Sequence, residues 1–178
     1  MPGLFAFLLL LQMSPAAPVA DSNVVFTQTV VKDVPPQVFI FKPGAGPYDS
    51  VAAEFDELIN YMSEKRIPGQ LAAVFYDDPA RVPAESLRWE VGVITNQPPF
   101  QTEPYTQKII SGRKVASLIV DGRPGQNHAR YASMRGFIRQ RRYIFRPPAM
   151  EILLQPQKEN ADPKTEILLP VQLLRRGK

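Results

Sequence analysis

The order of apolar segments repeats once along the chain, and this repeat constrains the fold more than any other feature. The first half has extended or strand patterns at residues 24–31, 37–41, 71–76 and 89–95, with a helical pattern at 49–65. The second half has strand patterns at residues 105–110, 114–120, 149–154 and 165–173, with a helical pattern at 126–142. The linker Gln97-Pro98-Pro99 separates the halves. The chain therefore predicts two β-α-β-β units, at about 30–95 and 104–172.

From this repeat we predict an α+β fold in which duplicated units join edge to edge. Both helices then lie on one face of a curved antiparallel sheet. A groove between the helices and the open sheet is where a ligand would bind. Apolar residues at helical spacing should face the sheet. These are Val51, Phe55, Leu58, Ile59 and Met62 in the first helix, and Tyr131, Met134, Phe137 and Ile138 in the second.

Residues 1–20 carry no charged side chain and include a short apolar run from Leu4 to Leu11. Small residues follow the run, and the first charge is Asp21. This pattern is typical of a secretory leader, although its start lacks Lys or Arg. The run is too short to span a bilayer, which takes about 20 helical residues. We expect an exported protein, with an uncleaved membrane anchor as the alternative, and a single domain over residues 21–178.

Composition excludes several kinds of chemistry. The chain has no cysteine, which excludes disulfides, thiolate metal sites and cysteine nucleophiles. It has a single histidine, His128, so neither a histidine metal site nor a catalytic triad is supported, and we interpret His128 as a structural or surface residue. No glycine-rich phosphate loop is present. We expect no metal, no cofactor and no catalytic set of this kind.

Charge is distributed unevenly. Residues 1–100 hold 6 basic and 11 acidic side chains, whereas residues 101–178 hold 15 basic and 6 acidic ones. We interpret the basic second half as a solvated helix face and expect no nucleic-acid partner, because no DNA-binding pattern accompanies it. Contact with anionic lipid head groups stays open as an alternative. The clustered arginines are Arg130, Arg135, Arg139, Arg141, Arg142 and Arg146.

A rigid polar connector joins the third and fourth segments of the first half. It begins Tyr76-Asp77-Asp78-Pro79 and continues Pro83-Ala84-Glu85-Ser86-Leu87-Arg88. Upstream, Gly46-Pro47-Tyr48 opens the first helical segment. This combination resembles the GyrI-like family, the effector-binding domains also found in multidrug-sensing transcription activators. The resemblance covers residues 30–172 and implies the duplicated fold described above. Nothing before residue 30 is long enough for the DNA-binding domain of those activators.

Two carboxylates begin or interrupt apolar strands, where an unpaired charge is costly. Glu151 precedes Ile152-Leu153-Leu154, and Glu166 precedes Ile167-Leu168-Leu169. The resemblance implies that a buried glutamate, ringed by aromatic residues, meets amphipathic cations. Glu151 matches that family position, with Leu153 where the family has tyrosine. Glu166 matches the family ending Thr-Glu-Ile-x-x-Pro-Val. A strand-edge position in water is the alternative for each.

Aromatic side chains that can line the groove are Tyr48, Trp89 and Tyr131, with Phe55 and Phe137 as core behind them. Aromatic rings offer apolar contact and a negative face to cations. The family repeats Gly-Pro-Tyr in its second half, but this chain has Gly122-Arg123-Pro124-Gly125-Gln126 there. The second tyrosine is missing, so the ligand preference of a relative does not transfer directly.

Three function classes follow. The first is a stand-alone protein that binds an amphipathic, aromatic or cationic small molecule through Glu151, Tyr48, Trp89, Tyr131 and Glu166. The second, implied by the resemblance, is a hydrolase of reactive small molecules in which Glu151 acts as a base if burial raises its pKa. The third is a protein-interaction or inhibitor module with a protein partner. We expect binding rather than catalysis.

Overall fold

The computed structural model describes residues 28–96, 103, 105–154 and 162–174. The expected leader, the linker Gln97-Pro98-Pro99 and residues 155–161, between the last two predicted strands, lie outside these residues. In the described part, neither helix is long and apolar enough to cross a membrane.

The elements of the first half are β1 (Val30–Val34), β2 (Gln37–Ala45), a 3-10 turn η1 (Tyr48–Ser50), α1 (Val51–Lys65), β3 (Gln70–Phe75), a 3-10 turn η2 (Ala84–Ser86) and β4 (Arg88–Thr95). Those of the second half are β5 (Thr106–Ile110), β6 (Arg113–Asp121), α2 (His128–Gln140), β7 (Tyr143–Phe145), β8 (Ala149–Leu154) and β9 (Lys164–Leu173).

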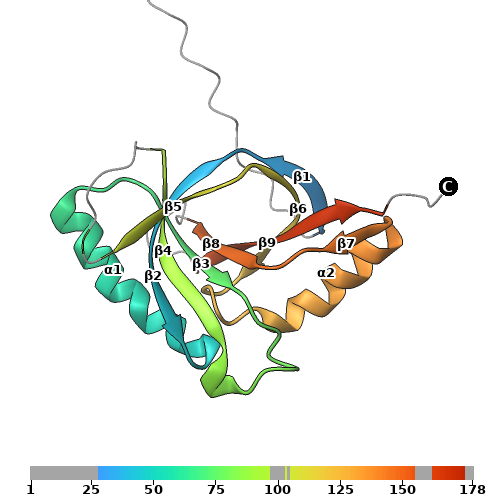
Figure 1. Cartoon of the computed structure of the whole chain (residues 1–178), viewed down its shortest axis with the longest axis horizontal. Coiled ribbons are helices and arrows are strands. Elements are labelled where there is room, and N and C mark those ends of the chain that lie inside the picture. The colour runs from blue at the N-terminus through green and yellow to red at the C-terminus, as the bar shows by residue number, and fades with distance from the viewer. Residues whose placement is uncertain (1–27, 97–102, 104, 155–161, 175–178) are drawn as a thin grey trace, which may run out of the picture.

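The strands form one antiparallel sheet in the order β1-β6-β9-β8-β3-β4-β2-β5, and β7 pairs with β9. The two units are β2-α1-β3-β4 and β6-α2-β8-β9. They join edge to edge through β3 and β8, where Ala73 lies opposite Glu151. Figure 1 shows the curled sheet with both helices on the same side of it. The duplicated α+β fold predicted from the repeat is therefore confirmed.

The outermost strands are exchanged between the halves. β1 belongs to the first half but pairs with β6, while β5 belongs to the second half but pairs with β2. The turns that follow these strands meet, because a Cβ on Gly112 would lie 3.0 Å from the Cδ of Pro36. The repeat in the sequence did not predict this exchange.

Alternation along the strands divides the buried residues between the two faces of the sheet. The helix face, contacted by both α1 and α2, holds the larger cluster, with Phe55 of α1 and Met134 of α2 at its centre. The opposite face holds a smaller cluster around Phe39, Phe41 and Met150. A candidate binding residue therefore belongs to one face or the other according to its strand register.

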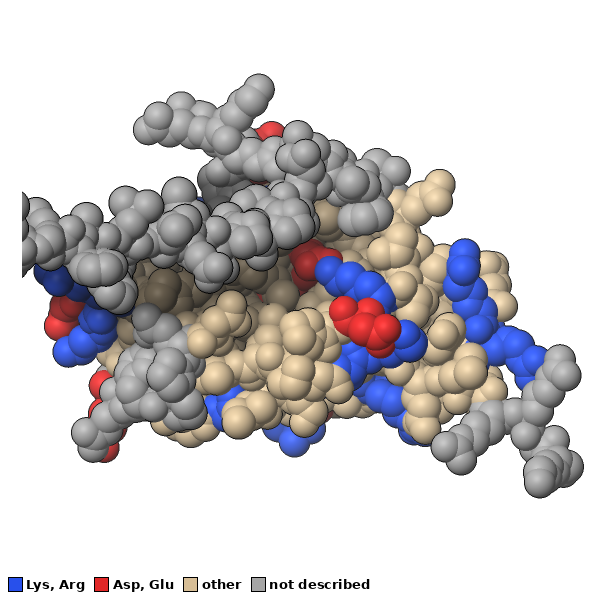
Figure 2. Space-filling model, turned by 90° about the horizontal axis from the view of Figure 1, so that it is seen from above, with Lys and Arg blue, Asp and Glu red and all other residues tan. Residues whose placement is uncertain are grey.

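Several of the clustered arginines contact other parts of the protein. Arg135 donates to Asp78 at 3.1 Å, the guanidinium of Arg141 lies 4.5 Å from the centroid of the Phe137 ring, and Arg146 donates to Gln172 at 2.9 Å. Seen from above, basic side chains are dispersed over the surface and several adjoin acidic ones (Figure 2). These contacts pair part of the basic surface within the protein, and they agree with the interpretation of a solvated helix face.

Candidate functional site

Glu151 lies at the centre of the sheet, on the helix face. In the strand register its neighbours are Ala73 of β3 and Ile167 of β9, both fully buried. Its own side chain is 0% exposed. A carboxylate in such a place must be hydrogen-bonded to be tolerated.

Three donors from the second unit satisfy the Glu151 carboxylate. The Gly125 N–H and the Asn127 amide donate to Oε2 at 2.9 and 3.0 Å, and the Tyr131 hydroxyl donates to Oε1 at 2.9 Å. All three donors are neutral, and no cation is paired with Glu151 among the described residues. Burial raises the pKa of Glu151 above its ordinary value, although the three hydrogen bonds oppose that shift.

Gly125 also brings the two units into contact. Its φ is +92°, and a Cβ there would lie 2.5 Å from the carbonyl oxygen of Tyr48. Only glycine combines this positive φ with so close an approach. The turn after β6 is therefore held between Tyr48 of the first unit and Glu151 of its own unit.

Aromatic rings pack beside this carboxylate. The His128 ring centroid lies 4.6 Å from that of Tyr48, 5.5 Å from that of Phe75 and 5.2 Å from that of Tyr131. Both ring nitrogens of His128 are buried and have no hydrogen-bond partner in the described part of the chain, and burial lowers the pKa of His128. The packed cluster of Glu151, Asn127, Tyr131, His128 and Tyr48 is here called the closed end. From the sequence we interpreted His128 as a structural or surface residue, and in the structure it packs among three aromatic rings.

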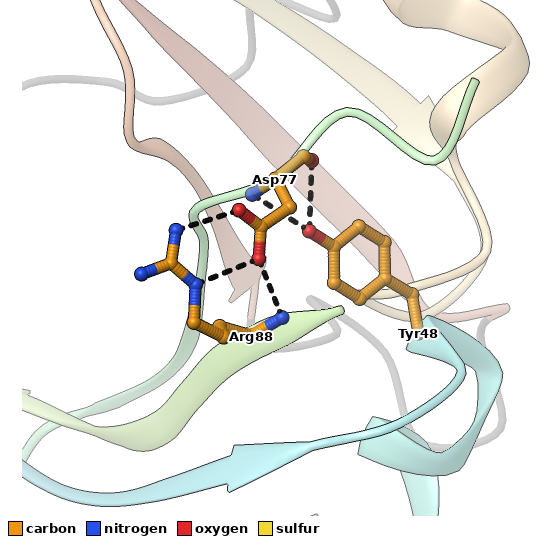
Figure 3. A network of polar contacts seen from close by, with 3 residues as sticks. All are labelled: Tyr48, Asp77 and Arg88. Carbon is orange, nitrogen blue, oxygen red and sulfur yellow. Dashed lines mark hydrogen bonds and ion pairs between the residues drawn. The ribbon is translucent and has the colours of Figure 1, made fainter. Parts of the chain in front are cut away.

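The Tyr-Asp-Asp-Pro connector fixes Tyr48 in this cluster (Figure 3). The Tyr48 hydroxyl donates to the Asp77 carbonyl oxygen at 2.8 Å and accepts from the Asp77 N–H at 3.0 Å. The Asp77 carboxylate accepts hydrogen bonds from the backbone N–H and the guanidinium of Arg88. The hydrogen bonds from the Arg88 side chain lower the pKa of Asp77. Burial raises the pKa of Tyr48 to about 12. The connector thus holds this ring against Phe75 and His128.

An open cavity of about 640 Å³ lies further along the helix face, beside the C-terminal half of α1. Ile59, Met62 and Ile67 form its wall, and Leu71 of β3 with Leu153 of β8 forms its floor. Ile59 is 44% exposed, although sequence periodicity placed it on the inner face of the helix. The remaining lining residues are Ser63, Arg66, Pro68, Gly69, Gln70 and Leu154.

The cavity, here called the open end, and the closed end share one surface. Leu71 and Leu153 lie two residues from Ala73 and Glu151 on β3 and β8, so their side chains point to the same face. That spacing corresponds to about 7 Å along the strands. Glu151 does not line the cavity but lies beyond its inner end.

The structure brings together some of the predicted site residues and separates others. Tyr131 and Tyr48 join Glu151 in the closed end, and Trp89 lies on the same face opposite Phe75. Glu166 lies on the opposite face, because it pairs in register with Ile152, and it accepts from Lys32 and Ser117. The two glutamates therefore belong to different environments.

Sequence reasoning missed Asn127, His128 and Arg66 as parts of this region. The sequence signal that points to a special turn before α2 is the pair Gly122 and Gly125, and both glycines have positive φ in the structure. Nothing in the spacing of the residues indicates that the open end is hollow.

A family model of GyrI-like small molecule binding domains matches residues 27–172. No curated protein matches the chain in sequence. Among solved structures, the EcmrR C-terminal domain has a TM-score of 0.62 at 16% identity, covering 83% of this chain and 98% of that one. A hydrolase from Listeria innocua has a TM-score of 0.55 at 16% identity, covering 82% and 92%. SAV2435 bound to tetraphenylphosphonium has a TM-score of 0.56 at 10% identity, covering 82% and 94%. At these identities the likeness concerns the fold.

Proposed function

The chain belongs to the GyrI-like small-molecule-binding domains, and from this premise we propose that it binds an amphipathic or aromatic small molecule at the open end. The observation that carries the proposal is the cavity of about 640 Å³ between α1 and the floor residues Leu71 and Leu153. Ligand sites occupy about 300–1,000 Å³ and are lined mainly by apolar side chains with a few polar groups. The open end has both properties.

A variant that fills the cavity tests this location. Ile59→Trp adds a bulky ring to the cavity wall, so it should abolish binding of an apolar dye or lipophilic ligand, measured by fluorescence titration. Ile109→Trp is the matched control, because Ile109 is 67% exposed on β5 and does not line the cavity. Equal loss of binding in both variants, or none in Ile59→Trp, would place the ligand elsewhere.

We further propose that Glu151 gives the closed end, which lies beyond the open end, a preference for cationic ligands. Its three donors are neutral, so a cationic ligand reaching the closed end would be the first positive charge beside it. Binding there requires the packed rings of Tyr48 and His128 to move apart. The structure of SAV2435 with tetraphenylphosphonium concerns a protein of the same fold and suggests the probe.

Calorimetry with lipophilic cations and neutral isosteres tests the role of Glu151. Glu151→Gln should weaken cation binding by about 1–3 kcal/mol, the range for a charged hydrogen bond. Glu166→Gln makes the same change on the opposite face of the sheet and should leave binding unchanged. Cation binding that is the same in wild type and Glu151→Gln would make the carboxylate purely structural.

Hydrolysis of a reactive small molecule is the second candidate function. Burial raises the pKa of Glu151, and a carboxyl group that titrates closer to neutrality is a better general base. The Listeria innocua hydrolase shares the fold. Turnover of a panel of electrophiles by wild type, absent in Glu151→Gln and retained in Glu166→Gln, would establish it. Ligand binding without turnover of any panel member would favour the binding module.

Export completes the proposal. The uncharged apolar start of the chain supports export. N-terminal sequencing of protein from its native host should find a mature start near Ala17 or Asp21. An intact Met1 would contradict cleavage. A protein partner that binds equally to wild type and Ile59→Trp would instead favour the interaction module.

A further inference from the structure

Arg66 is the one charged residue among the eleven described residues that line the open end. The other ten are apolar or uncharged, and none of them is acidic. A molecule bound there meets mainly apolar side chains and one charged residue, Arg66. The chemistry of the lining itself therefore distinguishes acidic from basic ligands.

The guanidinium of Arg66 has no ion-pair partner among the described residues. The neighbouring acidic residue, Glu64, pairs instead with Lys65 at 3.5 Å. Arginine presents a planar fork of donors that matches a carboxylate in a bidentate arrangement. An unpaired arginine beside an apolar cavity can therefore receive an acidic group without breaking an existing contact.

The backbone of Arg66 is unusual for an arginine. It ends α1 in the left-handed region, with φ 53° and ψ 43°. Glycine is the usual residue at such a position, because a side chain is disfavoured in this conformation. Arg66→Gly therefore removes the side chain from the cavity lining while it suits the backbone conformation.

Arg142 supplies the comparison. It follows α2 in the same left-handed conformation, with φ 61°, but it does not line the open end. The favourable interaction of a cation with a helix C-terminus applies to both arginines. Only Arg66 combines that position with a ligand-sized cavity.

We infer that the open end takes a free amphipathic molecule with an acidic head group, whose apolar body lies against Ile59 and Leu153 and whose carboxylate pairs with Arg66. This inference rests on the proposed function for the location of the site and adds the chemical class of the ligand. It also differs from the cation preference expected through Glu151, since that carboxylate lies beyond the cavity and is already bonded to three donors.

The test compares three probes of equal chain length by calorimetry, below their micelle-forming concentrations: dodecanoate, dodecanol and dodecyltrimethylammonium. Wild type should bind dodecanoate most tightly. Arg66→Gly suits the left-handed backbone, so the fold should be retained or slightly stabilised. It should weaken dodecanoate by about two- to fivefold, given the exposure of Arg66, and leave dodecanol unchanged. Arg142→Gly makes the same backbone change and should leave all three affinities unchanged.

The other outcomes distinguish the inference about the acidic head group from the proposed function of the open end. Equal dodecanoate affinity in wild type and Arg66→Gly, or tighter binding of the ammonium probe by wild type, overturns the inference about the acidic head group. Dodecanol binding that Ile59→Trp abolishes still supports the proposed function in that case. Failure of wild type to bind any of the three probes counts against both.

Discussion

The two ends of the helix face use the same strands and differ in what fills the space above them. At the closed end, donors of the second unit hold Glu151, and the rings of Tyr48 from the first unit and of His128 and Tyr131 from the second pack together beside it. At the open end, the described lining comes from α1 and the segment after it, with β3 and β8, and no residue of α2 contributes to it. The fold therefore provides a groove, while side-chain volume and the convergence of both units decide where the groove is hollow.

The largest expected effect concerns the closed end. Glu151→Ala removes a buried side chain, leaves the Gly125 N–H and the Tyr131 hydroxyl without this acceptor, and leaves the Asn127 amide with the Arg123 carbonyl oxygen alone. We expect a loss of about 3–5 kcal/mol in the free energy of unfolding. Urea denaturation followed by circular dichroism measures it. Glu166→Ala, on the opposite face, should cost clearly less, and comparable losses would mean that the closed end is not specially dependent on its carboxylate.

A smaller loss is expected where the connector holds the closed end together. Tyr48→Phe keeps the ring but removes the hydroxyl that donates to the Asp77 carbonyl and accepts from its N–H. We expect a cost of about 1–2 kcal/mol in the free energy of unfolding, the range for losing a buried hydrogen-bonding group. Thermal unfolding at neutral pH checks this. An unchanged midpoint would show that ring packing alone positions Tyr48.

The buried carboxyl group of Glu151 should make the stability of the closed end depend on pH. The pKa of Glu151 is raised above 4.5 in the folded protein, so the folded state binds more protons than the unfolded state above that pH. Wild type should therefore lose stability relative to Glu151→Gln as pH rises from 4.5 through the raised pKa. His128, whose pKa is lowered from 6.5, acts in the opposite sense but is present in both proteins. Denaturant midpoints across this range measure the difference, and parallel curves would contradict the assignment.

The smallest effect is expected at the open end, where adjacent residues of α1 offer an internal comparison. Leu58 is 1% exposed and packs in the core, whereas Ile59 is 44% exposed and lines the cavity. Leu58→Ala should cost about 2–5 kcal/mol, the usual range for a buried leucine. Ile59→Ala should cost about 0.5 kcal/mol or less, as at surface positions. Similar costs in chemical denaturation would mean that the cavity is closed in solution.

The sequence predicted the architecture because the helical and strand patterns are strong and occur twice. It placed Val51, Phe55 and Leu58 in the core, and these are buried. It could not separate Glu151 from Glu166, because each adjoins an apolar run and only the register between β8 and β9 assigns them to opposite faces. It also could not indicate that Ile59 borders a cavity, since spacing carries information about direction but none about the volume left between elements.

The exchange of β1 and β5 makes the halves of the molecule mutually dependent. Each half supplies the edge strand that completes the sheet of the other half. The two halves of the sequence are therefore not expected to fold as two independent units. Chains corresponding to either half alone would present an unpaired strand and an incomplete sheet edge, which favours association with the complementary fragment. The two halves are therefore related to each other as the subunits of a heterodimer that exchange a strand, joined here in one chain.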